Sequence, residues 1–596
     1  MALGEDQGGG LEGGEDRGGA FGDIARGYED GEIFGGLVEL GDGEGADGGF
    51  VAAFEGFEVV GVAAEAFEAM LLGGLGAFDI EAGLLGVFLG GEYDGGGEEG
   101  EPGQEEEPAR IEDGPGMWCA RGHGREFIGA RGLGCGAIGA RPPYTRGVEG
   151  LGCGLMSRRV VITGLGVVTG HGVGMEPLWE ALCAGRSALR PIGRFDASGF
   201  PCRLAAEVPE PFSAKDFVPK HYRKAVKVMA RDIELAVAAA SRAVGDARVA
   251  TRGTLAEDAT EKPTYPGSRM GCQIGAGLIA AEADELTGAL ATARREGGAG
   301  LDLKAWGRTG MDALTPLWLL KYLPNMLACH VTIIHGCEGP SNTITCAEAS
   351  GLLSIAESAR VIERGDADMG FAGGAESKVN LMGLLRMDFA GRVAHTGSAT
   401  DGGPVVRPFD PASAGGLLGE GAGLLVLEAH ETAMARGARV YAEIIGQGAG
   451  HSPWREAGAM NADEGYQAAV ENALDDAGLR ADDIDAIVPA GMGIPTMDAG
   501  EAGALRSIFG ARLAEVPLVT LAPSIGNTMA GWGGLQAAVA AKCVFEQRLP
   551  ARLHGGTPGA GLQAGAAAAR GAALRHVLVA TGASGGQNAA LILRRG

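Results

Sequence analysis

The chain has 596 residues and a formal charge of −27, and 108 of its residues are glycine. Residues 1–155 hold most of the excess negative charge, because they contain 31 acidic and eight basic side chains. From Met156 onward 41 basic and 45 acidic side chains nearly balance, which argues against a nucleic-acid or membrane-surface binding function.

The N-terminal segment 1–155 has an unusual composition. It is rich in glycine without the three-residue collagen period, and it contains no Ser, Asn or Lys. Such a segment cannot bury enough apolar surface to offset its backbone entropy, so we predict that it is disordered. The missing serine and asparagine favour translated upstream DNA with Met156 as the true start, and a real low-complexity tail is the alternative.

The apolar and cysteine patterns restrict where the protein works. The most apolar stretch, residues 70–90, is broken by Asp79, Glu81 and several glycines, so it is not a membrane span. The ten cysteines show neither metal-ligand nor disulfide-framework spacing. We therefore predict a cytoplasmic protein without a metal site or another cofactor.

Two segments follow Met156. Residues 158–170 read as a strand that runs into a glycine-rich loop, but the GxGxxxG spacing does not match a dinucleotide-binding loop. A long alanine-rich helix is predicted over 220–247, and its first basic residues recur at three- and four-residue spacing on one face. This face is either solvated surface or a docking site for an acidic partner. Its members are Lys220, Arg223, Lys224 and Lys227.

The central segment 336–364 carries the strongest chemical signal. A polar stretch ends at Cys346, and apolar residues at helical spacing then continue to about Arg364. Cys346 therefore lies at or just before a helix N-terminus, where backbone N–H groups and the helix dipole favour a thiolate. A buried structural cysteine is the alternative. Glu348 is expected to be a favourable acid in the first helical turn.

Short apolar strands alternate with helices along the rest of the chain. This pattern predicts an α/β protein with sheets covered on both faces. The expected strands are 269–277, 368–376, 419–428, 441–448, 484–488 and 576–580, and the expected helices are 460–478, 499–509 and 530–547.

Several motifs in this order resemble the β-ketoacyl-acyl-carrier-protein synthase family of the thiolase-like fold. They are the opening strand from Arg159, the segment Thr345-Cys346-Ala, the segment 360–368, the segment Arg407-Pro-Phe-Asp410 and the strand 419–428. The resemblance covers essentially 157–596. It implies a layered αβαβα fold made of two similar βα halves, 156–428 and 429–596.

The resemblance also implies which residues form the site. In this family a cysteine takes the acyl group, and two histidines hydrogen-bond the carbonyl of a malonyl thioester. Cys346 matches the nucleophile, but Ala490 stands at the first histidine, Thr528 at the second and Pro523 at a nearby lysine.

The C-terminal glycine loop departs from the family as well. Ser584 takes the place of a gating phenylalanine. The backbone N–H groups of Cys346 and Ser584 are the expected oxyanion hole, since backbone donors need no particular side chain.

Two functional hypotheses follow. The chain is either an acyltransferase that loads Cys346 without decarboxylative condensation, or a non-catalytic partner that resembles the chain-length-factor subunits of type II polyketide systems. The retained Cys346 favours the first hypothesis, and the missing histidines favour the second. Both imply fatty-acid or polyketide biosynthesis, an acyl carrier protein as partner, and a homodimer or a heterodimer with a ketosynthase.

Overall fold

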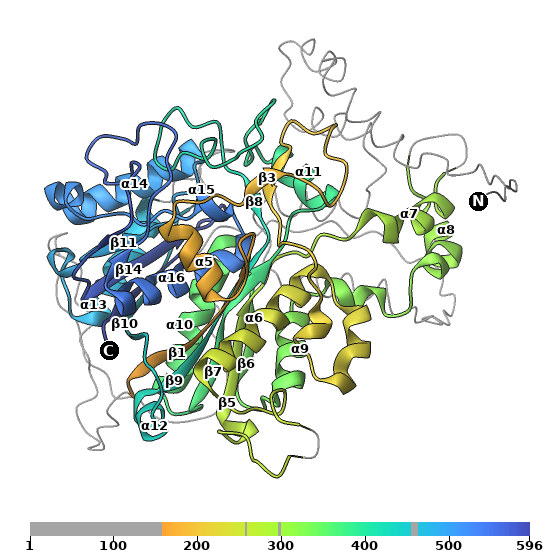
Figure 1. Ribbon diagram of the computed structural model, residues 1–596. Helices are drawn as coiled ribbons and strands as arrows, with labels where there is room; N and C mark the ends of the chain where they lie inside the picture. The colour runs from red at the N-terminus through yellow and green to blue at the C-terminus, as the bar shows by residue number, and fades with distance from the viewer. Residues whose placement is uncertain (1–157, 257–258, 296–299, 454–462) are drawn as a thin grey trace, which may run out of the picture. The chain divides into compact units, whose positions relative to one another are not determined.

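The computed structural model describes residues 158–596, apart from 257–258, 296–299 and 454–462 (Figure 1). The predictions made for residues 1–155 lie outside this part of the chain. Within it, no helix is both long enough and apolar enough to cross a membrane.

A ten-stranded sheet forms the centre of this body. Its strands run in the order β11-β14-β15-β10-β1-β9-β7-β5-β6, with β2 paired to β1. β1 and β10 join the two halves of the sheet as an antiparallel pair, with Val160 opposite Ile444. The bounds are β1 Val160–Thr169, β2 Gly172–Val173, β5 Met270–Gly275, β6 Ser341–Ile344, β7 Met369–Glu376, β9 Gly421–Ala429, β10 Ala442–His451, β11 Ala486–Val488, β14 His576–Gly582 and β15 Gln587–Arg594.

The two halves repeat one arrangement of strands and helices. The first half contains β1, α6, β5, α10, β7 and β9 in chain order, and the second contains β10, α13, β11, α16, β14 and β15 in the same roles. The four helices are α6 Arg231–Ala247, α10 Ser350–Glu363, α13 Asp463–Ala477 and α16 Trp532–Glu546. The prediction of two similar βα halves is therefore confirmed.

Close backbone packing holds the layers together. α6 covers the outer face of the first half-sheet, α13 covers that of the second, and α10 and α16 pack together between them (Figure 1). A Cβ on Gly166 would lie 1.9 Å from the Ala239 carbonyl of α6, and one on Gly448 would lie 2.0 Å from that of Ala469 in α13. Glycine at these positions lets helix and strand backbones touch, which gives the predicted αβαβα layers.

Shorter elements connect and flank these layers. The helices among them are α5 Met175–Cys183, α7 Ala283–Thr292, α8 Leu303–Ala305, α9 Met326–His335, α11 Leu381–Phe389, α12 His430–Ala435, α14 Pro495–Phe509 and α15 Ala522–Ile525. The strands among them are β3 Leu189–Pro191, β4 Leu204–Ala206, β8 Leu418–Gly419, β12 Arg548–Leu549 and β13 Arg570–Gly571.

The predicted helix over 220–247 is wrong in its first third. Lys220–Val228 forms a separate 3₁₀ helix, and α6 begins only at Arg231. Met229 has an extended backbone, with φ −100° and ψ 132°, which ends the first helix before the second can start. The strand β15 had no counterpart in the sequence prediction.

The layer contact between α16 and β9 gives a direct test of the packing. A Cβ on Gly534 would lie 2.0 Å from the carbonyl oxygen of Gly423, so Gly534→Ala must push helix and strand apart. We expect this substitution to lower the free energy of unfolding by about 3 kcal/mol or more, measured by urea denaturation.

Gly503→Ala is the matched control. Gly503 lies in α14, and no heavy atom lies within 4 Å of its added Cβ. Alanine there should be neutral or stabilise the protein by up to about 1 kcal/mol, because it favours the helix. Equal effects of the two substitutions would contradict the proposed close packing.

Candidate active site

The turn that carries Cys346 lies between β6 and α10. Cys346 precedes a 3₁₀ helix, Ala347–Ala349, and Ala347 has a positive φ of 45°. Such a conformation is strained for a residue with a Cβ. The backbone N–H of Cys346 donates a 2.7 Å hydrogen bond to the Ser350 hydroxyl oxygen. In this conformation it is therefore not free to serve the predicted oxyanion hole.

The environment of the Cys346 thiol does not favour a thiolate. The side chain is partly buried, and burial raises the pKa of the Cys346 thiol above its ordinary value. The shift is therefore opposite in direction to the one expected for a cysteine at a helix N-terminus. Cys346 forms no disulfide, and burial is the one cause of its pKa shift among the described residues.

Glu348, two residues later, lies in the first turn of the 3₁₀ helix as predicted, and its side chain points inward. It is fully buried, with 0% exposure. Its Oε1 accepts a 2.8 Å hydrogen bond from the Asn527 amide and forms an ion pair with the Arg392 guanidinium. The turn after Cys346 therefore presents a buried carboxylate to the interior of the protein.

Arg392 reaches this carboxylate from the loop that follows α11. It is 7% exposed, and its Nη1 lies 3.3 Å from the Ser584 hydroxyl oxygen in the C-terminal glycine loop. Its Nη2 lies 4.0 Å from the Met497 sulfur at the start of α14. One side chain thus contacts three separate segments of the site. Arg392 Nε and Glu348 Oε2 are buried without a hydrogen-bond partner among the described residues.

The loop that begins at Ala490 has a structural role. The N–H groups of Ala490 and Gly491 donate 2.8 Å hydrogen bonds to Glu501, and those of Met492 and Gly493 donate to Asp498. Both acids are buried; burial raises the pKa of Glu501, and it raises the pKa of Asp498 to about 7. Ala490 itself is buried and offers no side-chain donor.

The segment at Thr528 contains Asn527, a residue of the candidate site that the sequence analysis did not single out. The Thr528 side chain is fully buried and packs beneath Gly421, where an added Cβ would lie 2.7 Å from it. Pro523 is buried at the start of α15. The neighbouring Asn527 is the residue whose side chain reaches Glu348.

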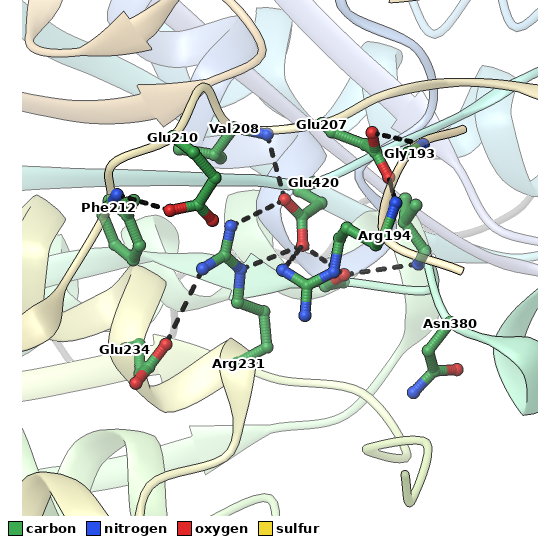
Figure 2. Close-up of polar contacts among 12 residues, drawn as sticks. Gly193, Arg194, Glu207, Val208, Glu210, Phe212, Arg231, Glu234, Asn380 and Glu420 are labelled. Carbon is green, nitrogen blue, oxygen red and sulfur yellow. Dashed lines mark hydrogen bonds and ion pairs between the residues drawn. The ribbon is translucent and has the colours of Figure 1, made fainter. Parts of the chain in front are cut away.

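The predicted docking residues lie on the 3₁₀ helix that precedes α6, and all four are exposed: Lys220, Arg223, Lys224 and Lys227. Arg231, the next basic residue, is turned inward. Figure 2 shows Arg231 and Arg194 directed at Glu420, with Arg231 nitrogens 2.9 Å from each carboxylate oxygen. This buried network fixes the start of α6 against the β8–β9 junction and leaves the basic 3₁₀ helix at the surface.

The comparisons with known proteins agree with this architecture. The family profile "Beta-ketoacyl synthase, N-terminal domain" matches residues 157–433, and "Beta-ketoacyl synthase, C-terminal domain" matches 441–555. The chain belongs to the β-ketoacyl synthase family. The family prediction from the sequence is thereby confirmed.

Relatives and solved structures are similar over most of their length. The 3-oxoacyl-[acyl-carrier-protein] synthase 2 of Staphylococcus aureus (strain N315) is 28% identical over 402 residues, 67% of this chain and 89% of that protein. The Synechocystis enzyme of the same name is also 28% identical, over 67% of this chain and 88% of its own. The solved ishigamide ketosynthase/chain length factor is 30% identical with a TM-score of 0.61, covering 74% of this chain and all of that one.

The Arg392–Glu348 pair can be tested through stability. Arg392→Met leaves a fully buried carboxylate without its cation, so we expect the free energy of unfolding to fall by about 3–5 kcal/mol. Adding Glu348→Gln to this variant should recover much of the loss, because the buried charge is then gone. Arg364→Met is the control, since its ion pair with Asp366 is about half exposed and should contribute less than about 1 kcal/mol. An equal loss of unfolding free energy in Arg392→Met and Arg364→Met would contradict the stabilising role of the buried pair. So would the absence of any recovery in the double variant.

The reactivity of Cys346 follows from the direction of its pKa shift. Only the thiolate reacts with iodoacetamide, so a raised pKa lowers the reactive fraction at neutral pH. We expect the alkylation rate at Cys346, followed by peptide mass spectrometry, to keep rising beyond the ordinary thiol pKa of about 8.5. A rate that is already maximal near neutral pH would instead indicate an activated nucleophile.

Proposed function

We propose that this chain is a non-condensing partner subunit of a complete β-ketoacyl synthase in fatty-acid or polyketide biosynthesis, with a role like that of a chain length factor. One observation carries the proposal. The buried Glu348–Arg392 ion pair lies where the nucleophile turn, the glycine loop and the start of α14 meet. In a condensing enzyme of this family, that space holds the cysteine and the two histidines.

The chemistry of these residues opposes condensation. Ala490 has no polar side-chain atom, and the Asn527 amide is already engaged by Glu348. The Arg392 guanidinium is paired with Glu348, so this cation is not free to bind the carboxylate of a malonyl group. Removal of one oxyanion donor costs about 2.7–4 kcal/mol of barrier, so the loss of both histidines should make condensation very slow.

The alternative function, acyl loading on Cys346, has less support. It needs a thiolate and two free backbone donors, but the Cys346 thiol has a raised pKa and its N–H is donated to Ser350. Only the presence of the Cys346 thiol favours acyl loading. The Ser584 N–H remains a predicted donor, because it makes no hydrogen bond to another described residue.

The proposed role includes two partners. A synthase with its catalytic residues intact would form a heterodimer with this chain, as the name of the ishigamide ketosynthase/chain length factor suggests for that protein. An acyl carrier protein, which is acidic, would dock on the exposed basic 3₁₀ helix.

The activity test uses the full chain with and without such a synthase. Alone, the chain should release almost no carbon dioxide from malonyl carrier protein. Added to the synthase, it should form a heterodimer on size-exclusion chromatography and change the chain length of the products. Cys346→Ala should act like the wild type in the mixture, whereas loss of the effect would favour acyl loading. Ready condensation by the chain alone would overturn both functions.

The docking surface predicts a salt-dependent complex. Reversing Arg223 and Lys224 to glutamate should weaken carrier-protein binding roughly tenfold or more at low salt, because both side chains are exposed and no acidic partner is bonded to them among the described residues. Binding is measured by surface plasmon resonance at several salt concentrations. Arg575→Glu, an exposed arginine elsewhere, should have little effect. If neither the charge reversal nor added salt changed the affinity for the carrier protein, this surface would be excluded as its docking site.

A further inference from the structure

A second cavity lies apart from the Glu348–Arg392 pair. Its volume is about 690 Å³, which falls within the range of small-molecule sites. It is formed by α5, the turn between β1 and β2, and the loop that leads into β3. Its chemically active lining residues are His171, Glu176, Glu180, Arg186, Arg190 and Asp401. None of them contributes to the candidate active site.

The hydrogen bonds of His171 fix which ring nitrogen carries the proton. The Ser524 hydroxyl donates its only hydrogen to the Arg186 carbonyl oxygen at 2.8 Å. The same oxygen, 2.9 Å from His171 Nε2, must therefore accept from that nitrogen. Burial and the neighbouring Arg186 lower the pKa of His171, so the ring is neutral. Its Nδ1 is left as an acceptor with no partner among the described residues.

Three of the charged groups that line the cavity are already neutralised by ion pairs. Arg190 pairs with Asp401 at 2.8 Å, and Glu176 pairs with Lys542 at 2.8 Å. The Arg186 guanidinium and the Glu180 carboxylate have no ion-pair partner among the residues that the structure describes. The cavity therefore offers one free cation, one free anion and one free acceptor.

We propose that this cavity binds a small zwitterion that carries an ammonium and a carboxylate group, that is, a free amino acid. The carboxylate would bind the Arg186 guanidinium, whose planar donors match a carboxylate in two parallel hydrogen bonds. The ammonium group would donate to Glu180 and to His171 Nδ1. A simple anion would be repelled by Glu180, and a simple cation would be repelled by Arg186.

The test applies the twenty standard L-amino acids one at a time to the full-length protein. Thermal shift identifies which of them stabilise the fold, and titration calorimetry measures affinity for the best one. We expect at least one to bind at millimolar concentration or below. Arg186→Gln and Glu180→Gln should each weaken it at least tenfold, as should removal of its amino group or its carboxylate. Arg575→Gln, a variant of an exposed arginine outside the cavity, should bind normally.

Three results would overturn the proposal. The first is that no amino acid binds at millimolar concentration. The second is that the analogue without its amino group binds as tightly as the amino acid, which would indicate a plain anion site. The third is binding that is unchanged in both the Arg186→Gln and the Glu180→Gln variants, which would place the ligand elsewhere.

Discussion

The ion pair between Glu348 and Arg392 determines what this site can do. A carboxylate with no solvent exposure is very unfavourable unless a cation and hydrogen bonds compensate it. Arg392 and Asn527 supply both, and Arg392 also contacts Ser584 in the glycine loop. The Arg392 side chain thereby links its own loop after α11 to the turn after Cys346 and to the C-terminal glycine loop. The pair therefore ties together segments that lie far apart in the sequence.

The scaffold around the pair depends on close backbone packing. Glycines such as Gly166, Gly448 and Gly534 bring helix and strand backbones into direct contact across the layers. Asp498 and Glu501 hold the loop at Ala490 through backbone N–H groups, although that loop presents no catalytic side chain. The fold thus brings the turn after Cys346, the loop after α11, the start of α14 and the C-terminal glycine loop to one place.

The sequence predicted the fold better than the site. Apolar strands, glycine turns and helical spacing are local signals, so the layered architecture and most of its elements followed from them. The helix at Lys220 was extended too far, because the helical charge pattern continues through the extended residue Met229. Arg392 could not be found from sequence, since it lies 44 residues from Glu348 and no local pattern links them. Asn527 could not be found either, since it lies 179 residues from the carboxylate that it contacts.

The most direct test of the account asks whether Cys346 carries an acyl group. The wild-type chain is incubated with an acyl carrier protein that bears an isotopically labelled acyl chain, and the intact mass of the protein is then measured. A subunit whose site is closed by the Glu348–Arg392 pair should show no mass increase, while a complete synthase in a parallel reaction becomes acylated. A labelled adduct on the wild type that disappears in Cys346→Ala would contradict the account and identify the chain as an acyltransferase.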